Sequence, residues 1–274
     1  MDQVRLRDLY ETNGYLILPA FFSGSEISDL ERIQRELWRQ PRNPNIVVDI
    51  LSDDGRGRRM RLADAPAEFE FQKYKINDAY LESDDLRAIL LSKKVSGLLR
   101  GLLGGDPLII NSLYFVLGSE QNLHFDTWYM SPPAEDKMAV ISICIDDQTD
   151  ENGPLMYVPE SHKIPKYRFS NGSLREMPGE VAACHEFLRQ QLAERNLKTE
   201  RFFGKSGDVF VWHSQLLHGG SPRKNRDATR RSLVVHYWRN GDIEATDEFP
   251  DFNGISKQSY DGYYLDRGHQ RISA

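Results

Sequence analysis

Six short runs of apolar, β-branched and aromatic residues follow one another between residues 108 and 238, and they constrain the fold more than any other feature of the chain. Turn-forming residues separate the runs, and most are of ordinary length for a strand. The runs are 108–117, 122–129, 138–145, 155–158, 208–212 and 231–238. This spacing predicts a mainly β core, built as an all-β barrel or a double-sheet jelly roll.

Helical patterns flank the β region. Residues 6–11 predict a helix and 15–18 a strand, and Ser23 with Glu26 predicts a capping box at the start of a second helix. A long helix is expected over 84–103 and a helical insertion over about 179–195. The predicted fold class is therefore mainly β with flanking helices: a double-stranded β-helix (jelly-roll, cupin-like) core with N-terminal helices and a helical insertion.

The length of 274 residues fits one large β-rich domain or two small ones, and we favour a single domain over 1–274. Residues 1–105 are expected to form a mostly helical cover with N-terminal strands, 106–240 the jelly-roll core and 241–274 an aromatic-rich C-terminal tail. Residues 41–66 break the periodic pattern and predict a charged loop, with Arg56 to Arg61 at its centre. The sequence leaves open whether this loop or the tail closes over a site.

Charge and cysteine content limit the partners. A net charge of −6 argues against a general nucleic-acid binder, so we expect a small-molecule substrate and no nucleic acid. Cys144 and Cys184 are too few for a disulfide framework, which fits a reducing cytoplasm. The charged residues at the amino terminus do not resemble a signal peptide, and no apolar run is long enough for a membrane span. The oligomeric state stays open.

The motif His124-Phe125-Asp126 predicts part of a metal site. If these residues lie on a strand, His124 and Asp126 point to the same face and reach one ion. The pair alone is a weak signal, because both residue types are common in strands and turns. His218 follows the run 208–212 and supplies a third ligand. Two imidazoles and one carboxylate leave one face of the metal open, which suits non-heme Fe(II) and O2 chemistry.

A second set of residues predicts a co-substrate. Arg230 and Ser232 share one face of the run that ends the core, where a guanidinium and a hydroxyl together would hold a carboxylate. Arg231 should face the other way, in an ordinary ion pair. A 2-oxoglutarate molecule unites these parts, because its keto acid end chelates Fe(II) while its far carboxylate needs a cation. The predicted cofactors are Fe(II), 2-oxoglutarate as co-substrate, and O2.

Several segments resemble the phytanoyl-CoA dioxygenase family of Fe(II)/2-oxoglutarate-dependent oxygenases, over most of the chain. They are residues 10–19 (YETNGYLILP), 152–155 (NGPL), 158–163 (VPESHK) and 207–210 (GDVF), the last leading to His218. The resemblance implies His124, Asp126 and His218 as the catalytic metal ligands. It also implies that Arg230 and Ser232 bind the distal carboxylate of 2-oxoglutarate.

The sequence departs from the family pattern at two points. Glu160 occupies a place usually given to glycine, and Arg230 follows His218 by twelve residues, one more than expected. An extra residue in the loop 222–228 would absorb the second departure without changing the register of the strand. If the register slips, Arg231 takes the place of Arg230.

The resemblance implies a dioxygenase that hydroxylates an unactivated carbon of a small molecule, with succinate and CO2 as co-products. Similar halogenases carry a small residue in place of Asp126, so the carboxylate favours hydroxylation. The same iron centre also serves desaturation, epimerisation and ring or endoperoxide formation, and these alternatives stay open. A catalytically silent jelly-roll binding protein is a third hypothesis. The identity of the substrate is left open.

Other polar and aromatic residues have a functional and a structural interpretation. The amide of Asn122 would share the ligand face and reach 2-oxoglutarate, or it ends a strand. Trp128 and Tyr129 would line a substrate pocket, or pack at a strand end. Lys75, with Lys73 on the same face of a possible strand, would meet an anionic substrate or face solvent.

The strand before the motif and three further histidines are given structural interpretations. Ser112 and Tyr114 alternate on that strand, and ordinary strand packing is the safer interpretation for both. His213 and His236 are expected to be structural, and His162 belongs to a turn.

Overall fold

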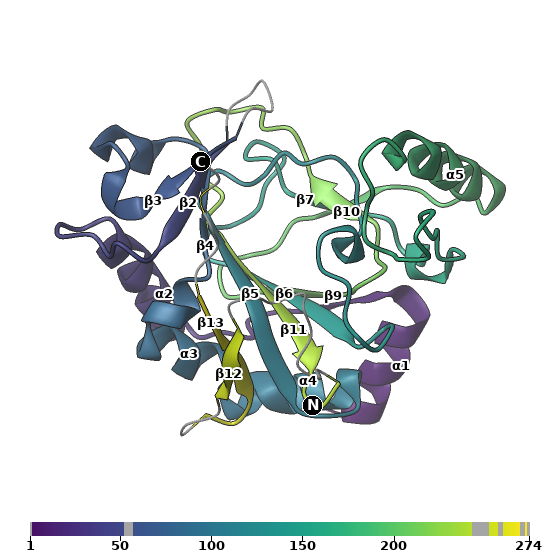
Figure 1. The fold of residues 1–274 in the computed structure, drawn as a ribbon, viewed down its shortest axis with the longest axis horizontal. Helices are drawn as coiled ribbons and strands as arrows, with labels where there is room; N and C mark the ends of the chain where they lie inside the picture. Colours follow the sequence, from purple (N-terminus) through teal and green to yellow (C-terminus); the bar gives the residue numbers. More distant parts are fainter. Residues whose placement is uncertain (1, 52–56, 243–251, 257–259, 269–271, 273–274) are drawn as a thin grey trace.

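Two antiparallel sheets face each other at the centre of the protein (Figure 1). This computed structural model describes residues 1–274 except 1, 52–56, 243–251, 257–259, 269–271 and 273–274. The large sheet runs in the order β1-β9-β6-β11-β5-β4-β2-β3, with β13 beside β5 and β12 beside β13, and the small sheet in the order β10-β7-β8. Neighbouring strands of the main path are antiparallel, and β13 pairs with β5 in parallel.

The strands are β1 (Tyr15–Leu18), β2 (Val47–Ile50), β3 (Arg58–Arg61), β4 (Tyr74–Asn77), β5 (Pro107–Phe115), β6 (Met138–Cys144), β7 (Leu155–Tyr157), β8 (Glu200–Phe202), β9 (Val209–His213), β10 (His218–Gly220), β11 (Ser232–Arg239), β12 (Phe252–Ser256) and β13 (Tyr263–Arg267). The α-helices are α1 (Gln3–Asn13), α2 (Gly24–Leu37), α3 (Asp84–Leu90), α4 (Lys93–Leu103) and α5 (Val181–Glu194). None of the helices in this described part of the chain is both long and apolar enough to cross a membrane.

The large sheet has one face against helices and one face toward the small sheet. Because side chains alternate along a strand, β5 and β11 each send every second residue to the helical side. There the hydroxyl of Tyr114 donates to the Leu30 carbonyl of α2 at 3.2 Å, and that of Tyr237 donates to the Leu90 carbonyl of α3 at 3.0 Å. The intervening residues are thereby aimed into the space between the sheets.

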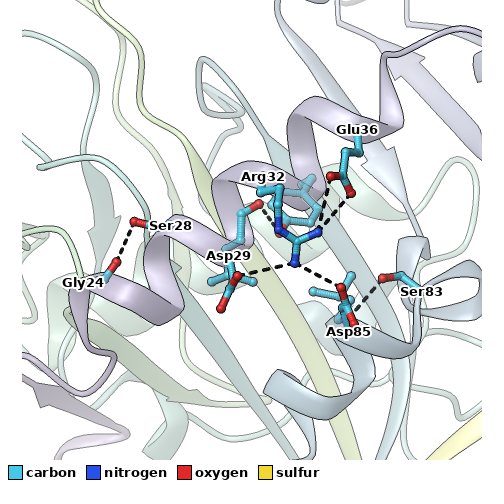
Figure 2. Close-up of polar contacts among 10 residues, drawn as sticks. Gly24, Ser28, Asp29, Arg32, Glu36, Ser83 and Asp85 are labelled. Carbon is cyan, nitrogen blue, oxygen red and sulfur yellow. Dashed lines mark hydrogen bonds and ion pairs between the residues drawn. The ribbon is translucent and has the colours of Figure 1, made fainter.

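Helices α2 and α3 meet through charged groups at their rim (Figure 2). The guanidinium of Arg32 lies between Asp29 and Glu36 of its own helix and reaches Asp85 of α3 at 3.0 Å. These side chains are largely exposed, so the pairs contribute little to stability. The apolar face of α2, with Ile27, Leu30 and Ile33 buried, holds the helix against the sheet.

The structure confirms the main expectations for the fold. The chain is mainly β with flanking helices, the capping box of Ser23 and Glu26 is present, and α5 is the predicted helical insertion. The described part of the aromatic tail folds back onto the core, where Tyr263 and Tyr264 pair with the start of β5. Phe249 lies outside the described residues.

Three local predictions are wrong. The helix over 84–103 is two helices, because Ser92 takes the extended conformation of an N-cap residue between α3 and α4. The expected loop 41–66 contains β2 and β3, although Arg56 lies outside the described residues. The expected strand 122–129 is one isolated bridge at His124 followed by a 3-10 turn over Asp126–Trp128.

The backbone conformation at Glu160 fits a position where the family pattern usually has glycine. Its φ is 62°, in the left-handed region that glycine adopts most easily, so this backbone position has the conformation that the family's glycine would take. A lysine holds the side chain locally, since Lys163 Nζ lies 2.7 Å from Glu160 Oε1. His162 lies in the same 3-10 turn, as predicted.

The capping box gives a test of the α2 assignment. Replacing Ser23 with alanine removes the hydroxyl that accepts from the Glu26 N–H, and should lower the free energy of unfolding by about 1 kcal/mol. Chemical denaturation measures the change. Ser28→Ala is the control, because this exposed hydroxyl only donates to the Gly24 carbonyl within the helix, and it should be nearly neutral. Equal effects of the two substitutions would argue against the cap.

Candidate active site

A cavity of about 360 Å³ lies between the two sheets and collects most of the predicted site residues. The large sheet contributes alternate residues of β4, β5 and β11, while the small sheet and the segment 119–130 close the other side. Its polar and aromatic lining includes Arg59, Lys75, Asn77, Asn111, His124, Asp126, Tyr129, Trp212, His218, Arg230, Ser232 and His236. Its size is at the lower end for ligand pockets.

A backbone bridge brings His124 and His218 together. The His124 N–H donates to the His218 carbonyl at 2.9 Å, and the His218 N–H donates to the His124 carbonyl at 3.1 Å. The glycines that follow His218 permit this approach, because a Cβ on Gly219 would lie 2.5 Å from the Gln121 carbonyl oxygen. The two imidazole centroids are 4.4 Å apart.

Backbone carbonyls orient both imidazoles. His124 Nδ1 lies 2.8 Å from the Asn122 carbonyl oxygen and His218 Nδ1 lies 2.9 Å from that of Leu216. A carbonyl only accepts, so both Nδ1 atoms carry the proton and donate. This leaves the Nε2 lone pair of each ring free for a metal ion.

The carboxylate of Asp126 completes the set. Its Oδ2 accepts a hydrogen bond from Trp212 Nε1 at 2.7 Å, and its Oδ1 lies 3.9 Å from His124 Nε2 and 3.6 Å from His218 Nε2. All three residues are buried, and their ligand atoms lie within 4.8 Å of one another. Two imidazoles and one carboxylate in this arrangement match a facial triad for non-heme iron.

The protonation states of His124 and Asp126 favour the binding of a metal cation. Burial lowers the pKa of His124 to about 4, and the neighbouring His218 adds to the effect. Burial alone would raise the pKa of Asp126, but the imidazoles of His218 and His236 outweigh it and hold the pKa below its ordinary value. A neutral His124 and an ionised Asp126 are the forms that bind a metal ion.

His236 is part of this site, and its interpretation as a satisfied structural histidine is wrong. Its Nε2 lies 3.4 Å from Asp126 Oδ1, and its buried Nδ1 has no hydrogen-bond partner. The ring faces the cavity because His236 follows Ser232 by four residues on β11. His213 is structural as predicted, with Nδ1 accepting the Gln215 N–H at 3.1 Å.

Arg230 is a buried cation with no counter-charge among the described residues. It is 5% exposed, and no carboxylate of the described residues forms an ion pair with it. Its Nε and the Oγ of Ser232 have no hydrogen-bond partner, and burial lowers the pKa of Arg230 to about 10. Such a group is costly unless an anion binds beside it. The buried guanidinium and hydroxyl therefore fit a ligand carboxylate.

The backbone around Arg230 is shaped to admit its side chain. Gly118 has a φ of 74°, and a Cβ there would lie 2.5 Å from Arg230 Nε. Arg231 points to the opposite side, as predicted, where it pairs with Asp146 at 2.6 Å and Glu31 at 2.8 Å. Arg230 follows His218 by twelve residues and, just before β11, lines the cavity.

The other predicted residues divide between the cavity and its surroundings. Tyr129 and Lys75 line the cavity. Trp128 packs against Phe125 and His185 instead, with centroids 5.8 and 5.5 Å away, and lines a separate hollow. Asn122 is exposed and is not brought to the cavity, because its segment is not a strand; only its carbonyl serves the site, through His124.

Sequence reasoning missed Trp212, His236 and Asn111. Asn111 pairs with His236 across β5 and β11, and its buried Oδ1 has no partner while its Nδ2 donates to Asp78. Alternation along β11 from Arg230 and Ser232 was a signal for His236. The strand interpretation instead singled out Ser112 and Tyr114, and Tyr114 faces α2.

Comparisons with known proteins agree with this geometry. The family model described as phytanoyl-CoA dioxygenase matches residues 10–232. A probable alpha-ketoglutarate-dependent hypophosphite dioxygenase of Stutzerimonas stutzeri is 24% identical over 242 residues, covering 83% of this chain and 76% of that protein. An ectoine dioxygenase of Stutzerimonas stutzeri (strain A1501) is 28% identical over 251 residues, covering 84% and 75%.

The fold also matches solved structures. The non-heme alpha ketoglutarate dependent carbocyclase SnoK from nogalamycin biosynthesis superposes with a TM-score of 0.65 at 17% identity, covering 86% of this chain and 83% of that chain. At this identity the likeness concerns the fold.

The hydrogen bond from Trp212 gives a test of the metal site. In Trp212→Phe, Asp126 loses the donor that orients its carboxylate, so the affinity for Fe(II), measured anaerobically, should fall about 10- to 100-fold. Trp238→Phe is the matched control, since this buried indole donates to Met138 Sδ on another part of the sheet. Unchanged metal affinity in well-folded Trp212→Phe would contradict the assignment.

Proposed function

The chain belongs to the phytanoyl-CoA dioxygenase family, whose model matches residues 10–232, and on this premise we propose that it hydroxylates an unactivated carbon of a small molecule. It is an Fe(II)- and 2-oxoglutarate-dependent dioxygenase; both curated relatives above are named as dioxygenases, and one of them as alpha-ketoglutarate-dependent. The co-products of the proposed reaction are succinate and CO2.

One observation carries the proposal. Arg230, which is buried and forms no ion pair with the described residues, lines the same cavity as the ligand set of His124, Asp126 and His218. A metal site alone would fit many activities. A metal site and a buried cation facing one small cavity fit a bidentate keto acid with a second carboxylate. The residues present therefore fit both Fe(II) and 2-oxoglutarate.

In this proposal His124, Asp126 and His218 hold Fe(II). When bound, the metal and 2-oxoglutarate supply the activation of O2 and the oxidising power of the reaction. The protein contributes fixed ligands: carbonyls orient the two rings, and Trp212 orients the carboxylate. It also contributes burial, which keeps bulk water from the reacting carbon.

Arg230 and Ser232 bind the distal carboxylate of 2-oxoglutarate in the same proposal. The guanidinium offers a planar pair of N–H donors and the hydroxyl offers a third, which fixes the co-substrate in one orientation. Gln148 supports the arginine, because its Oε1 lies 3.5 Å from Arg230 Nη1. The metal ligands and the arginine thus hold the two ends of one molecule.

Hydroxylation is favoured over the other outcomes of this chemistry. The carboxylate of Asp126 occupies the position that a halogenase would leave open for chloride, and the curated relatives named above are dioxygenases of small molecules. Ring formation, epimerisation and desaturation would use the same iron centre and are the alternative.

We propose three further properties of the chain. Residues 1–274 act as one domain, supported by the pairing of tail strand β13 with β5. The two facing sheets form a jelly roll, supported by the cavity between them. The protein works in the cytoplasm, supported by the free, buried thiols of Cys144 and Cys184.

Turnover of the co-substrate tests the function. Aerobic incubation with Fe(II) and 2-oxoglutarate should produce succinate, followed by chromatography, at a rate that rises with an acceptable substrate. A metal chelator should abolish succinate formation because it removes the Fe(II) that His124, Asp126 and His218 are proposed to hold. A well-folded protein that neither binds 2-oxoglutarate nor forms succinate would leave the binding-protein hypothesis in its place.

Neighbouring arginines give a sharper test. Arg230→Ala removes the only cation expected at the distal carboxylate, and should weaken 2-oxoglutarate binding about 10- to 100-fold while metal affinity stays the same. Arg231→Ala is the matched control, since this residue pairs with Asp146 on the outer side. Calorimetric titration measures the affinities for 2-oxoglutarate and for the metal ion. The proposal is wrong if Arg231→Ala weakens 2-oxoglutarate binding and Arg230→Ala does not.

A further inference from the structure

A second positive region lines the cavity, formed by Arg59 and Lys75. Their strands, β3 and β4, lie toward the end of the large sheet away from β1 and β9 (Figure 1). The strand register places Arg59 of β3, Asp49 of β2 and Lys75 of β4 directly opposite one another. The same row continues through Phe115 of β5 to Ser232 of β11. Residues in one such row share a face, so Arg59 and Lys75 face the cavity that Ser232 faces.

The carboxylate of Asp49 accepts hydrogen bonds from Arg59 and Asn77, and not from Lys75. Arg59 donates to its two carboxylate oxygens at 2.6 and 2.9 Å, and Asn77 Nδ2 donates at 3.2 Å. Burial would raise the pKa of Asp49, which is 6% exposed, but the hydrogen bonds from Arg59 and the charge of Lys75 lower it. The carboxylate is therefore ionised, and Arg59 alone forms a complete bidentate pair with it.

Lys75 is the cation in excess. Its Nζ lies 3.6 Å from Asp49 Oδ2, beyond hydrogen-bond range, and this is its sole ion pair within the described residues. Arg59, Lys75 and Asp49 together leave one positive charge at the wall. A purely structural role would not need that charge, because Arg59 already neutralises Asp49.

The remainder of the cavity is balanced once the cofactors are bound. A doubly charged metal ion, Asp126, the dianion 2-oxoglutarate and Arg230 have charges that sum to zero. This step rests on the function proposed above. The single positive charge at Lys75 is then without a counter-charge in a partly buried setting, where an anion gains more than in open water.

We propose that Lys75 binds an anionic group, a carboxylate or a phosphate, on the primary substrate. Lys75 lines both the cavity and a second hollow beside it, so the group sits at their junction. The substrate is thus an organic acid or phosphate ester whose oxidised carbon reaches past this junction toward His124 and Asp126. Lys75 determines specificity and does not take part in the oxidation.

A turnover-free titration tests this inference with two simple anions in place of the substrate. The protein is loaded with Zn(II) in place of Fe(II) and saturated with 2-oxoglutarate, and inorganic phosphate and acetate are titrated separately by calorimetry. We expect at least one of them to bind, and the tighter of the two indicates whether the substrate carries a phosphate or a carboxylate.

Variants at one position separate charge from packing. Lys75→Met and Lys75→Gln should weaken the binding of that anion about 10- to 100-fold, because both remove the charge. Lys75→Arg should retain it. Lys205→Met is the control, since this exposed lysine pairs with Asp147 and does not line the cavity, and it should bind the anion as the wild type does. Each variant should bind 2-oxoglutarate within about twofold of the wild type.

The outcomes distinguish this inference from the proposed function. If 2-oxoglutarate fails to bind the Zn(II)-loaded wild type, the proposed function is wrong and the inference falls with it. If 2-oxoglutarate binds but neither anion binds more tightly than about 10 mM, the inference alone is wrong. It is equally wrong if well-folded Lys75→Met and Lys75→Gln bind the anion as tightly as the wild type.

Discussion

The register of β11 between β5 and β6 determines where the charged groups of the cavity lie. Ser232 pairs with Phe115 on one side and Cys144 on the other, and this places Arg230, Ser232 and His236 on the inner face. A slip of one residue would turn all three outward and bring Arg231 inward. The ion pairs of Arg231 with Asp146 and Glu31 hold the present register from outside. One pairing choice thus creates both the stabilising ion pairs and the unpaired cation.

When no ligand is bound, the buried polar groups of the site lower the stability of the protein. Arg230, Asp126 and three imidazoles are removed from water, and the guanidinium has no counter-charge among the described residues. Burying such groups opposes folding unless a ligand compensates. The apolar core between the large sheet and helices α2 to α4 supplies the compensating stability. A site that bears this cost when empty binds its metal and co-substrate more tightly, because the groups are already in place.

The sequence predicted those parts of the fold and site that depend on local pattern. Runs of apolar, β-branched and aromatic residues between turns identified most core strands, and the spacing of Arg230 and Ser232 placed them on one face. His124 and Asp126 meet for a different reason than predicted: a single bridge to His218 and a 3-10 turn, with no strand between them. Trp212 and His236 were missed because their roles depend on which residues face each other across strands far apart in sequence. Such pairings are a property of the sheet and cannot be read from one segment.

The division of the large sheet explains why the cofactors were easier to predict than the substrate. The groups assigned to iron and 2-oxoglutarate come from residues 124–126, from His218 at the start of β10, and from residues 230–232 at the start of β11. Their motifs are short and chemically specific. Lys75 and Arg59 lie instead on β4 and β3, toward the other end of the sheet, and the sequence around Arg59 predicted a charged loop. Lysine and arginine are ordinary on exposed strands, so only the cross-strand row through Asp49 reveals that they face the cavity. Strands at this end of the sheet can change their side chains without disturbing the register of β11, which favours this end for substrate selection beside a fixed cofactor site.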